Sequence, residues 1–356
     1  MERLRALVYG TILLLAFGWV LHVGKEILVP AVFGAVIVYV VVGIADGLGR
    51  LPAVGAALPL RVRYALSIAA IGFAGLQFIY LLLANKERAI AMAPQFQQSL
   101  LASIQRLAVH FGFETEPTWE TLRKELLARI DLQQFLGSIL ASVGSIAVTL
   151  VVVLLYATFL LVEKRAFDAK LANLSDDPAR VARIRGVIGA INRRIGSYLA
   201  LKTLLSVLLA VASYVVMRLF GLEFAGLWAV LIAVLNFVPY VGSVLGVVLP
   251  MLMTIVQFED LGVVLSMLLA LSVLQFAIGN FLDPYVMGNS LNLSPFAILI
   301  SLAVWSELWG VPGAFLAVPI AAILTIVLSE FPGTRPLAVL LSLNGQVGRG
   351  RGSMPP

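Results

Sequence analysis

Long apolar stretches with almost no charge dominate the sequence. Five of them are bounded by charged or turn residues, at about 6–24, 27–45, 64–84, 139–162 and 198–220. About 20 apolar residues span the ~30 Å hydrocarbon core of a bilayer as a helix, in which backbone N–H and C=O groups pair internally. With 61% hydrophobic and 12% charged residues, a soluble fold would expose apolar surface throughout. The sequence therefore predicts an all-α integral membrane protein.

The charged residues are concentrated between the apolar stretches. A polar insert, 85–138, carries apolar residues at helical spacing and predicts extramembrane or interfacial helices. Segments 46–63 and 163–197 are rich in Lys and Arg, and positive residues beside spans stay in the cytoplasm. We therefore predict a cell inner or plasma membrane protein with cytoplasmic N- and C-termini and an external insert. The net charge of +6 indicates membrane topology and attraction to anionic lipid rather than nucleic-acid binding.

The C-terminal half contains two apolar segments that are too long for one ordinary helix. They run from Phe224 to Phe258 and from Ser294 to Leu328, and each is interrupted by Pro and Gly. About eight transmembrane segments result if each is a bent crossing, and six if each is a re-entrant hairpin. Glu259 and Asp260 lie inside in the first case and outside in the second.

These features divide the chain into five regions. They are N-terminal transmembrane helices (1–84), a helical insert (85–138), transmembrane helices with the basic loop 163–197 (139–220), a broken-helix transport core (221–335) and a flexible tail (336–356).

The breaks in the C-terminal half have chemical consequences. Proline removes a backbone donor and clashes with the carbonyl four residues earlier, which leaves polar groups that lipid cannot satisfy. In transporters with discontinuous helices, such ends face the solute: helix N-termini attract electron-rich groups and freed carbonyls bind cations or donors. We therefore expect a solute pathway at 236–243, 279–284 and 309–313. A packing kink is the alternative for any single proline.

Three ordered motifs carry a family resemblance. They are 236–243 (NFVPYVGS), 279–288 (GNFLDPYVMG) and 310–319 (GVPGAFLAVP). Through them the chain resembles the AI-2E family of autoinducer-2 exporter-like permeases. The resemblance implies a homo-oligomeric inner-membrane permease, with some members linked to export of a furanose-derived quorum signal and others to sodium/proton exchange. Asp283 stands where the family pattern has Glu, so a carboxylate is kept.

Polar and break residues form the candidate pathway. Asp283 suits ion or proton coupling, although it could instead cap the turn before Pro284. Glu307 lies in an apolar run, and amides could bind a polyhydroxylated solute or join helices. Lys202 and Arg218 are expected to snorkel. The predicted pathway residues are Asn236, Pro239, Tyr240, Gly242, Ser243, Gln275, Asn280, Asp283, Pro284, Gly288, Glu307, Pro312 and Gly313.

Nothing in the sequence indicates catalysis. Cysteine is absent, and neither a phosphate-binding loop nor a zinc-protease motif occurs. His22 and His110 lack metal-ligand spacing. We predict no enzyme activity, cofactor or metal. The leading function is export of a small polar solute by a permease; the alternatives are a cation/proton antiporter, with a cation as its partner, and a non-transporting membrane scaffold.

Overall fold

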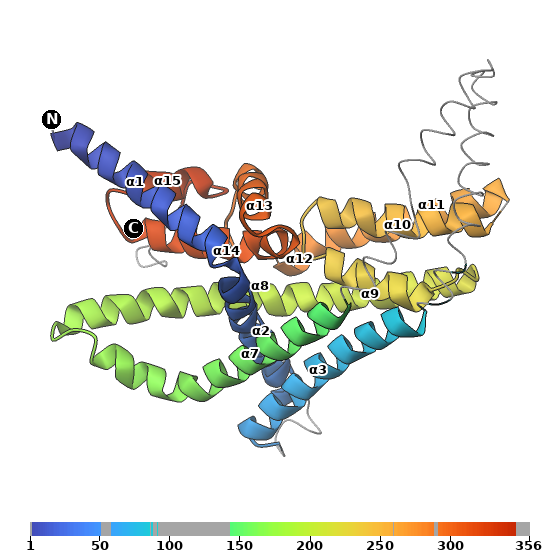
Figure 1. Cartoon of the computed structure of the whole chain (residues 1–356), viewed down its shortest axis with the longest axis horizontal. Helices are drawn as coiled ribbons and strands as arrows, with labels where there is room; N and C mark the ends of the chain where they lie inside the picture. The colour runs from blue at the N-terminus through green and yellow to red at the C-terminus, as the bar shows by residue number, and fades with distance from the viewer. Residues whose placement is uncertain are drawn as a thin grey trace, which may run out of the picture. The chain divides into compact units, whose positions relative to one another are not determined.

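The computed structural model describes residues 2–50, 58–85, 87, 91, 143–258, 260–287 and 291–346. This part of the chain contains twelve α-helices and one π-helical segment, and it contains no sheet (Figure 1). The prediction of an all-α protein is confirmed. Almost all of the predicted helical insert, 85–138, lies outside the described residues.

Five helices form the N-terminal and middle parts of the chain. Their lengths follow the predicted spans, but two of them continue well into the segment 163–197. The predicted basic loop is therefore two helix ends joined by a short turn at 173–177. The five helices are α1 (Glu2–Val23), α2 (Lys25–Gly49), α3 (Leu60–Ala84), α7 (Val143–Ala172) and α8 (Pro178–Leu219).

The C-terminal half is built from shorter helices. It comprises α9 (Ala225–Leu235), α10 (Val241–Gln257), α11 (Leu261–Phe276), the π-helical η1 (Ala277–Leu282), α12 (Asp283–Met287), α13 (Pro295–Trp309), α14 (Val311–Ser329) and α15 (Arg335–Leu341). The last helix covers the beginning of the predicted tail, 336–341. Its final residue bonds to the chain just before α13, where the N–H of Ser294 donates to the Leu341 carbonyl at 2.9 Å.

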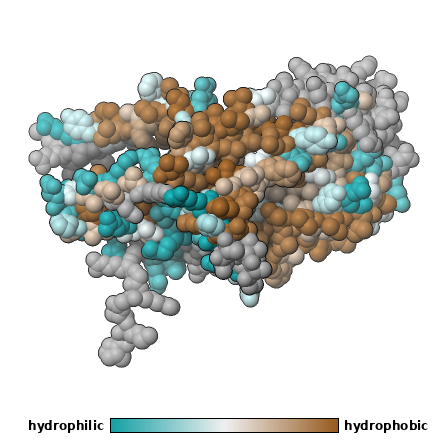
Figure 2. Space-filling model, turned by 90° about the horizontal axis from the view of Figure 1, so that it is seen from below, coloured by the Kyte–Doolittle hydropathy of each residue, from teal (hydrophilic) through white to brown (hydrophobic). Residues whose placement is uncertain are grey.

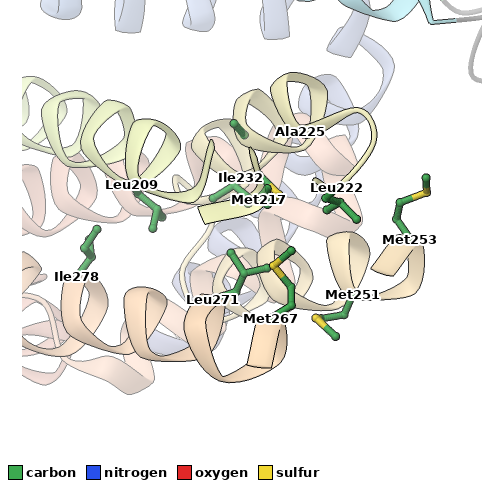
Figure 3. Packing of buried hydrophobic residues seen from close by; sticks show 11 residues of the cluster. Leu209, Met217, Leu222, Ala225, Ile232, Met251, Met253, Met267, Leu271 and Ile278 are labelled. Carbon is green, nitrogen blue, oxygen red and sulfur yellow. The ribbon is translucent and has the colours of Figure 1, made fainter. Parts of the chain in front are cut away.

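The helices form two compact units. Unit 1 comprises 1–71, 151–203 and 287–356, and unit 2 comprises 72–150 and 204–286, so the division falls within α3, α7, α8 and α12. The core of unit 1 includes Tyr198 and Leu199 of α8 against Val318 and Ala322 of α14. The core of unit 2 gathers apolar side chains from α8, α9, α10, α11 and η1, most of them Leu, Ile and Met (Figure 3).

Both overlong apolar segments fold as helical hairpins. Along α10, Gly242 faces the carbonyl of Leu235 and Gly246 faces Ile232, one turn earlier in α9. Residue numbers therefore rise along α10 as they fall along α9, which makes the two helices antiparallel neighbours. A bent crossing would carry these residues apart.

The second hairpin has the same construction. Gly313 of α14 faces the carbonyl of Trp305, and the Ser301 hydroxyl donates to the Ala317 carbonyl at 2.7 Å. The helices α13 and α14 are thus antiparallel as well.

Six helices in the described part are long and apolar enough to cross a membrane. They are α2, α3, 144–164 of α7, α8, 261–287 and α14. The helices α9, α10 and α13 are shorter, with 11, 17 and 15 residues. Two of the eight predicted spans supply no helix of this length. The apolar part of α1, Val8–Val23, is shorter, and the segment 224–258 divides at its break into α9 and α10. Apolar side chains cover much of the described surface (Figure 2).

The hairpin at 225–257 makes a topological prediction. A hairpin returns the chain to the side it came from, so Asp260 should lie on the same membrane face as the insert 85–138. We expect a membrane-impermeant maleimide to label Asp260→Cys in intact cells, as it labels Glu87→Cys. Arg185→Cys should react only after permeabilisation. The chain has no native cysteine to interfere. If Asp260→Cys, like Arg185→Cys, is labelled only after permeabilisation, the hairpin is contradicted.

Candidate functional site

The tip of the first hairpin, in unit 2, is a sharp and strained turn. The helix α9 ends at Leu235 and α10 begins at Val241, directly after Tyr240, whose φ is +61°. A positive φ is unfavourable for a bulky side chain and persists only where surrounding contacts impose it. Here Pro239 precedes the strained residue, and the N–H of Gly242 donates to the Val238 carbonyl at 2.9 Å.

A glycine closes the first tip. A Cβ atom at Gly242 would lie 1.8 Å from the carbonyl oxygen of Leu235. No side chain fits at that distance, so the first turn of α10 rests directly on the last turn of α9. The sequence singled out Gly242 as part of a break, and the structure supplies this physical reason for it.

The tip of the second hairpin, in unit 1, uses the same device. Gly310 separates α13 from α14 with φ +64° and ψ −141°, a conformation open to glycine. Pro312 follows in the first turn of α14, where a missing N–H costs nothing. A Cβ atom at Gly313 would lie 1.8 Å from the carbonyl oxygen of Trp305. Each tip therefore combines a residue of positive φ, a proline and a glycine seated on a carbonyl.

A buried polar pair lies at the first tip. Asn236, the residue that ends α9, donates from its side-chain amide to the Ser206 hydroxyl of α8 at 3.0 Å. Both residues are at least nine-tenths buried within the chain, with exposed fractions of 6% and 2%. Sequence reasoning selected Asn236 but missed Ser206, because serine in an apolar helix usually bonds to its own backbone.

A second amide side chain of unit 2, that of Gln257, links two parts of the chain. Gln257, at the end of α10, accepts the N–H of Glu223 at 2.7 Å and donates to the Gly221 carbonyl at 2.8 Å. These two bonds tie the last turn of α10 to the segment between α8 and α9. Of the two roles that the sequence allows for amide side chains, the structure favours joining helices for Gln257.

The predicted pathway part 279–284 lies in η1 and the start of α12, and the predicted residue Gln275 precedes it on α11. Gln275 faces α10, with its Nε2 atom 4.0 Å from the position of a Cβ at Gly246. Asn280 lies in η1 and donates to the Phe276 carbonyl at 3.3 Å. Such π-helical turns are rare and frequently occur at functional sites.

The motif 279–288 ends in a short helix. Asp283 opens α12 directly after η1, and its Oδ1 atom is buried. Pro284 and Tyr285 are exposed. Gly288 lies outside the described residues.

The second tip carries a tryptophan pair and an acid. The rings of Trp305 and Trp309 lie 4.9 Å apart, and the Trp309 indole donates to the Leu21 carbonyl of α1 at 2.9 Å. Glu307, between them in sequence, is exposed on the surface of the chain. The bond to α1 was not foreseeable, because a carbonyl 288 residues away leaves no sequence signal.

Lys202 corrects the expectation of a snorkelling side chain. This residue of α8 is buried, with an exposed fraction of 7%. Arg218, near the other end of the predicted span, is exposed. A buried lysine in a membrane-spanning helix is uncommon and marks a candidate pathway position that sequence reasoning set aside.

The described residues bring together Asn236, Pro239, Tyr240, Gly242 and Ser243 at the tip of one hairpin. Pro312 and Gly313 form the other tip, with Glu307 at the end of α13. In these parts of the chain no three His, Asp or Glu side chains are grouped so as to hold a metal ion.

Comparison with known proteins identifies the family. The model of the AI-2E family transporters matches residues 11–333 of the chain. The chain belongs to this transporter family. The resemblance in the three motifs is thereby confirmed, and this AI-2E protein is a multi-pass membrane protein of a transporter family rather than an enzyme family.

Relatives of this AI-2E protein have names that agree with the family. "Putative transport protein YhhT" of Escherichia coli is 30% identical over 258 residues, 71% of each chain. "AI-2 transport protein TqsA" of the same organism is 29% identical over 208 residues, 58% of this chain and 59% of its own. A "Putative transport protein" of Borreliella burgdorferi is 35% identical over 194 residues, and the match spans 53% of that relative's length.

The two seated glycines predict a pair of destabilised variants. In Gly242→Ala and Gly313→Ala the new methyl group would overlap a backbone oxygen, so the hairpin tip must open. Overpacking of this kind costs about 1–3 kcal/mol. We expect the midpoint of thermal unfolding of the detergent-solubilised protein to fall by roughly 1–4 °C.

Gly186→Ala is the matched control for these variants. Gly186 lies in α8, and nothing lies within 4 Å of a Cβ there. Alanine favours helix over glycine, so the midpoint should stay or rise. Equal effects at all three positions would show that the carbonyl contacts do not hold the tips.

Proposed function

We propose that this AI-2E protein is a permease that exports a small polar solute and that the hairpin tips form part of its solute pathway. The observation that carries the proposal is the repeated construction of the tips. Each ends one helix and begins another within an apolar segment, with a glycine seated on a carbonyl. A packing kink would need only one bent helix, whereas the chain builds two complete hairpins.

The chemistry of the tips supports a polar solute. Some backbone groups of the tips bond within the tip itself: the N–H of Gly242 donates to the Val238 carbonyl at 2.9 Å, and the N–H of Gly310 donates to the Ser306 carbonyl at 2.8 Å. Helix ends offer further N–H groups and carbonyls that have no partner within their own helix. The N–H groups suit an electron-rich oxygen and the carbonyls suit a hydroxyl donor. Ser243, in the first turn of α10, adds a half-buried hydroxyl. A compact, oxygen-rich solute matches this set of donors and acceptors, and the relative TqsA is named an AI-2 transport protein.

A cation/proton antiporter is the second candidate. Asp283 favours it, since this carboxylate opens α12 directly after a π-helical segment and has a buried oxygen. Acids within membrane segments commonly bind coupling ions or relay protons. Glu307 is the second acid that could serve, although it is exposed on the isolated chain.

Flux into liposomes separates the candidate functions. We expect a labelled polar solute to enter vesicles that contain the protein faster than empty vesicles, with sodium uptake unchanged by an imposed proton gradient. Sodium uptake driven by that gradient, and lost in Asp283→Asn or Glu307→Gln, would favour the antiporter instead. Absence of both fluxes across a panel of solutes would support a scaffold.

The buried amide at the first tip allows a sharper test of the pathway. Asn236→Leu and Ser206→Ala both remove the hydrogen bond between α8 and the hairpin, but only Asn236→Leu removes the amide. If the amide also binds solute, transport should fall by roughly tenfold more in Asn236→Leu, the equivalent of one hydrogen bond. The unfolding midpoints of both variants report the structural loss. Equal transport in the two variants would place Asn236 outside the pathway.

A further inference from the structure

A cavity of about 580 Å³ lies in unit 1, between the first turns of α8 and the end of α14. Its walls include Arg180, Arg183 and Ile184 from α8, and Val327, Glu330 and Phe331 from the other side. None of these residues belongs to the predicted solute pathway. The cavity is therefore a feature that the transport hypothesis leaves unexplained.

The two walls come from antiparallel helices. In the core of unit 1, Tyr198 and Leu199 of α8 belong to the same cluster as Val318 and Ala322 of α14. At the cavity, lower residue numbers of α8 face higher residue numbers of α14. The N-terminus of α8 and the C-terminus of α14 consequently lie at the same end of the unit.

This arrangement gives the two walls opposite polarity. On the α8 side, Arg180 and Arg183 are three residues apart, share a helix face and stand beside the positive end of the helix dipole. On the α14 side, Glu330 ends the helix beside the negative end of its dipole. Neither guanidinium forms an ion pair with a carboxylate of the described residues. Both arginines are exposed and can reach a ligand.

The formal charges of the lining balance. Asp177 joins Glu330 against the two arginines, although one carboxylate oxygen of Asp177 already accepts the Ala179 N–H at 2.9 Å. A purely anionic ligand would place its charge near Glu330, and a purely cationic one near the arginines. A zwitterion with its two charges separated matches the walls.

The rest of the cavity lining is apolar. Ile184, Val187 and Ile188 follow the arginines on the same face of α8, and Val327 lies opposite them. The apolar helix α14, long enough to cross a membrane, ends at Ser329. The cavity thus lies where the apolar part of α14 gives way to charge, at the level expected for lipid headgroups.

We propose that this cavity binds an aminophospholipid, with the headgroup phosphate on Arg180 and Arg183, the ammonium group on Glu330, and part of an acyl chain against Ile184 and Val327. Arginine suits the phosphate, because its planar fork donates two parallel hydrogen bonds. A carboxylate at a helix C-terminus suits a primary ammonium group. The apolar part of the lining selects a lipid over a water-soluble phosphoester.

Native mass spectrometry of the full chain in detergent micelles tests the proposal. Phosphatidylethanolamine, phosphatidylglycerol and water-soluble glycerophosphoethanolamine are added in turn at equal concentration. We expect phosphatidylethanolamine to bind about tenfold more tightly than the other two. Equal binding of phosphatidylglycerol would overturn the role of Glu330, and equal binding of glycerophosphoethanolamine would overturn the assignment to a lipid.

Variants at the exposed charges then locate the site. The double variant Arg180→Gln/Arg183→Gln should lose about tenfold in phosphatidylethanolamine affinity. Glu330→Gln should lower the preference for phosphatidylethanolamine over phosphatidylglycerol to near unity. Arg185→Gln is the matched control, since Arg185 is exposed on α8 but does not line the cavity. An equal loss in the control would show adsorption to a basic surface and overturn the proposal. All four side chains are exposed, so the variants keep the core intact.

Discussion

In a membrane interior no water is present to satisfy a backbone N–H or C=O group, and this constraint governs the whole chain. It requires helices wherever the chain contacts lipid and makes every interruption of a helix costly unless protein or a ligand covers it. The two hairpin tips meet this requirement through direct contact between backbones. Gly242 and Gly313 bring the start of one helix onto the last turn of the helix before it.

The same constraint connects the tips to their surroundings. At the first tip, the amide of Asn236 is held by the Ser206 hydroxyl of α8, so a polar group in an apolar setting has a partner. At the second tip, the indole of Trp309 reaches a carbonyl at the end of α1. Gln257 closes the open end of the first hairpin with two further bonds. Each hairpin is therefore held to a neighbouring element of its own unit by specific hydrogen bonds, which suits a pathway that must keep its shape among apolar helices.

The charged residues are distributed differently from the polar groups of the tips. Basic residues gather on the extended ends of α7 and α8, where we expect them to set topology and to meet lipid headgroups. At the cavity beside α14 they meet a carboxylate at the end of an antiparallel helix, which gives the two walls opposite polarity. Lys202 breaks this pattern, because the residue is buried within the chain. The sequence could not predict this burial, because a lysine near the end of an apolar stretch can equally well extend its side chain to water.

The sequence by itself determined that the chain lies in a membrane, that it is all-α and where its helices break. Segment length, apolar content and proline placement act locally along the chain. Its three motifs also determined the family. Only the tertiary structure decided whether each overlong segment bends or turns back, since this depends on whether Gly242 and Gly313 pack against a backbone carbonyl. The partners Ser206 and Leu21 were equally undetermined, because they come from helices distant in sequence. Periodicity and composition predict which residues a helix presents on its surface, and only tertiary packing decides which other helix contacts them.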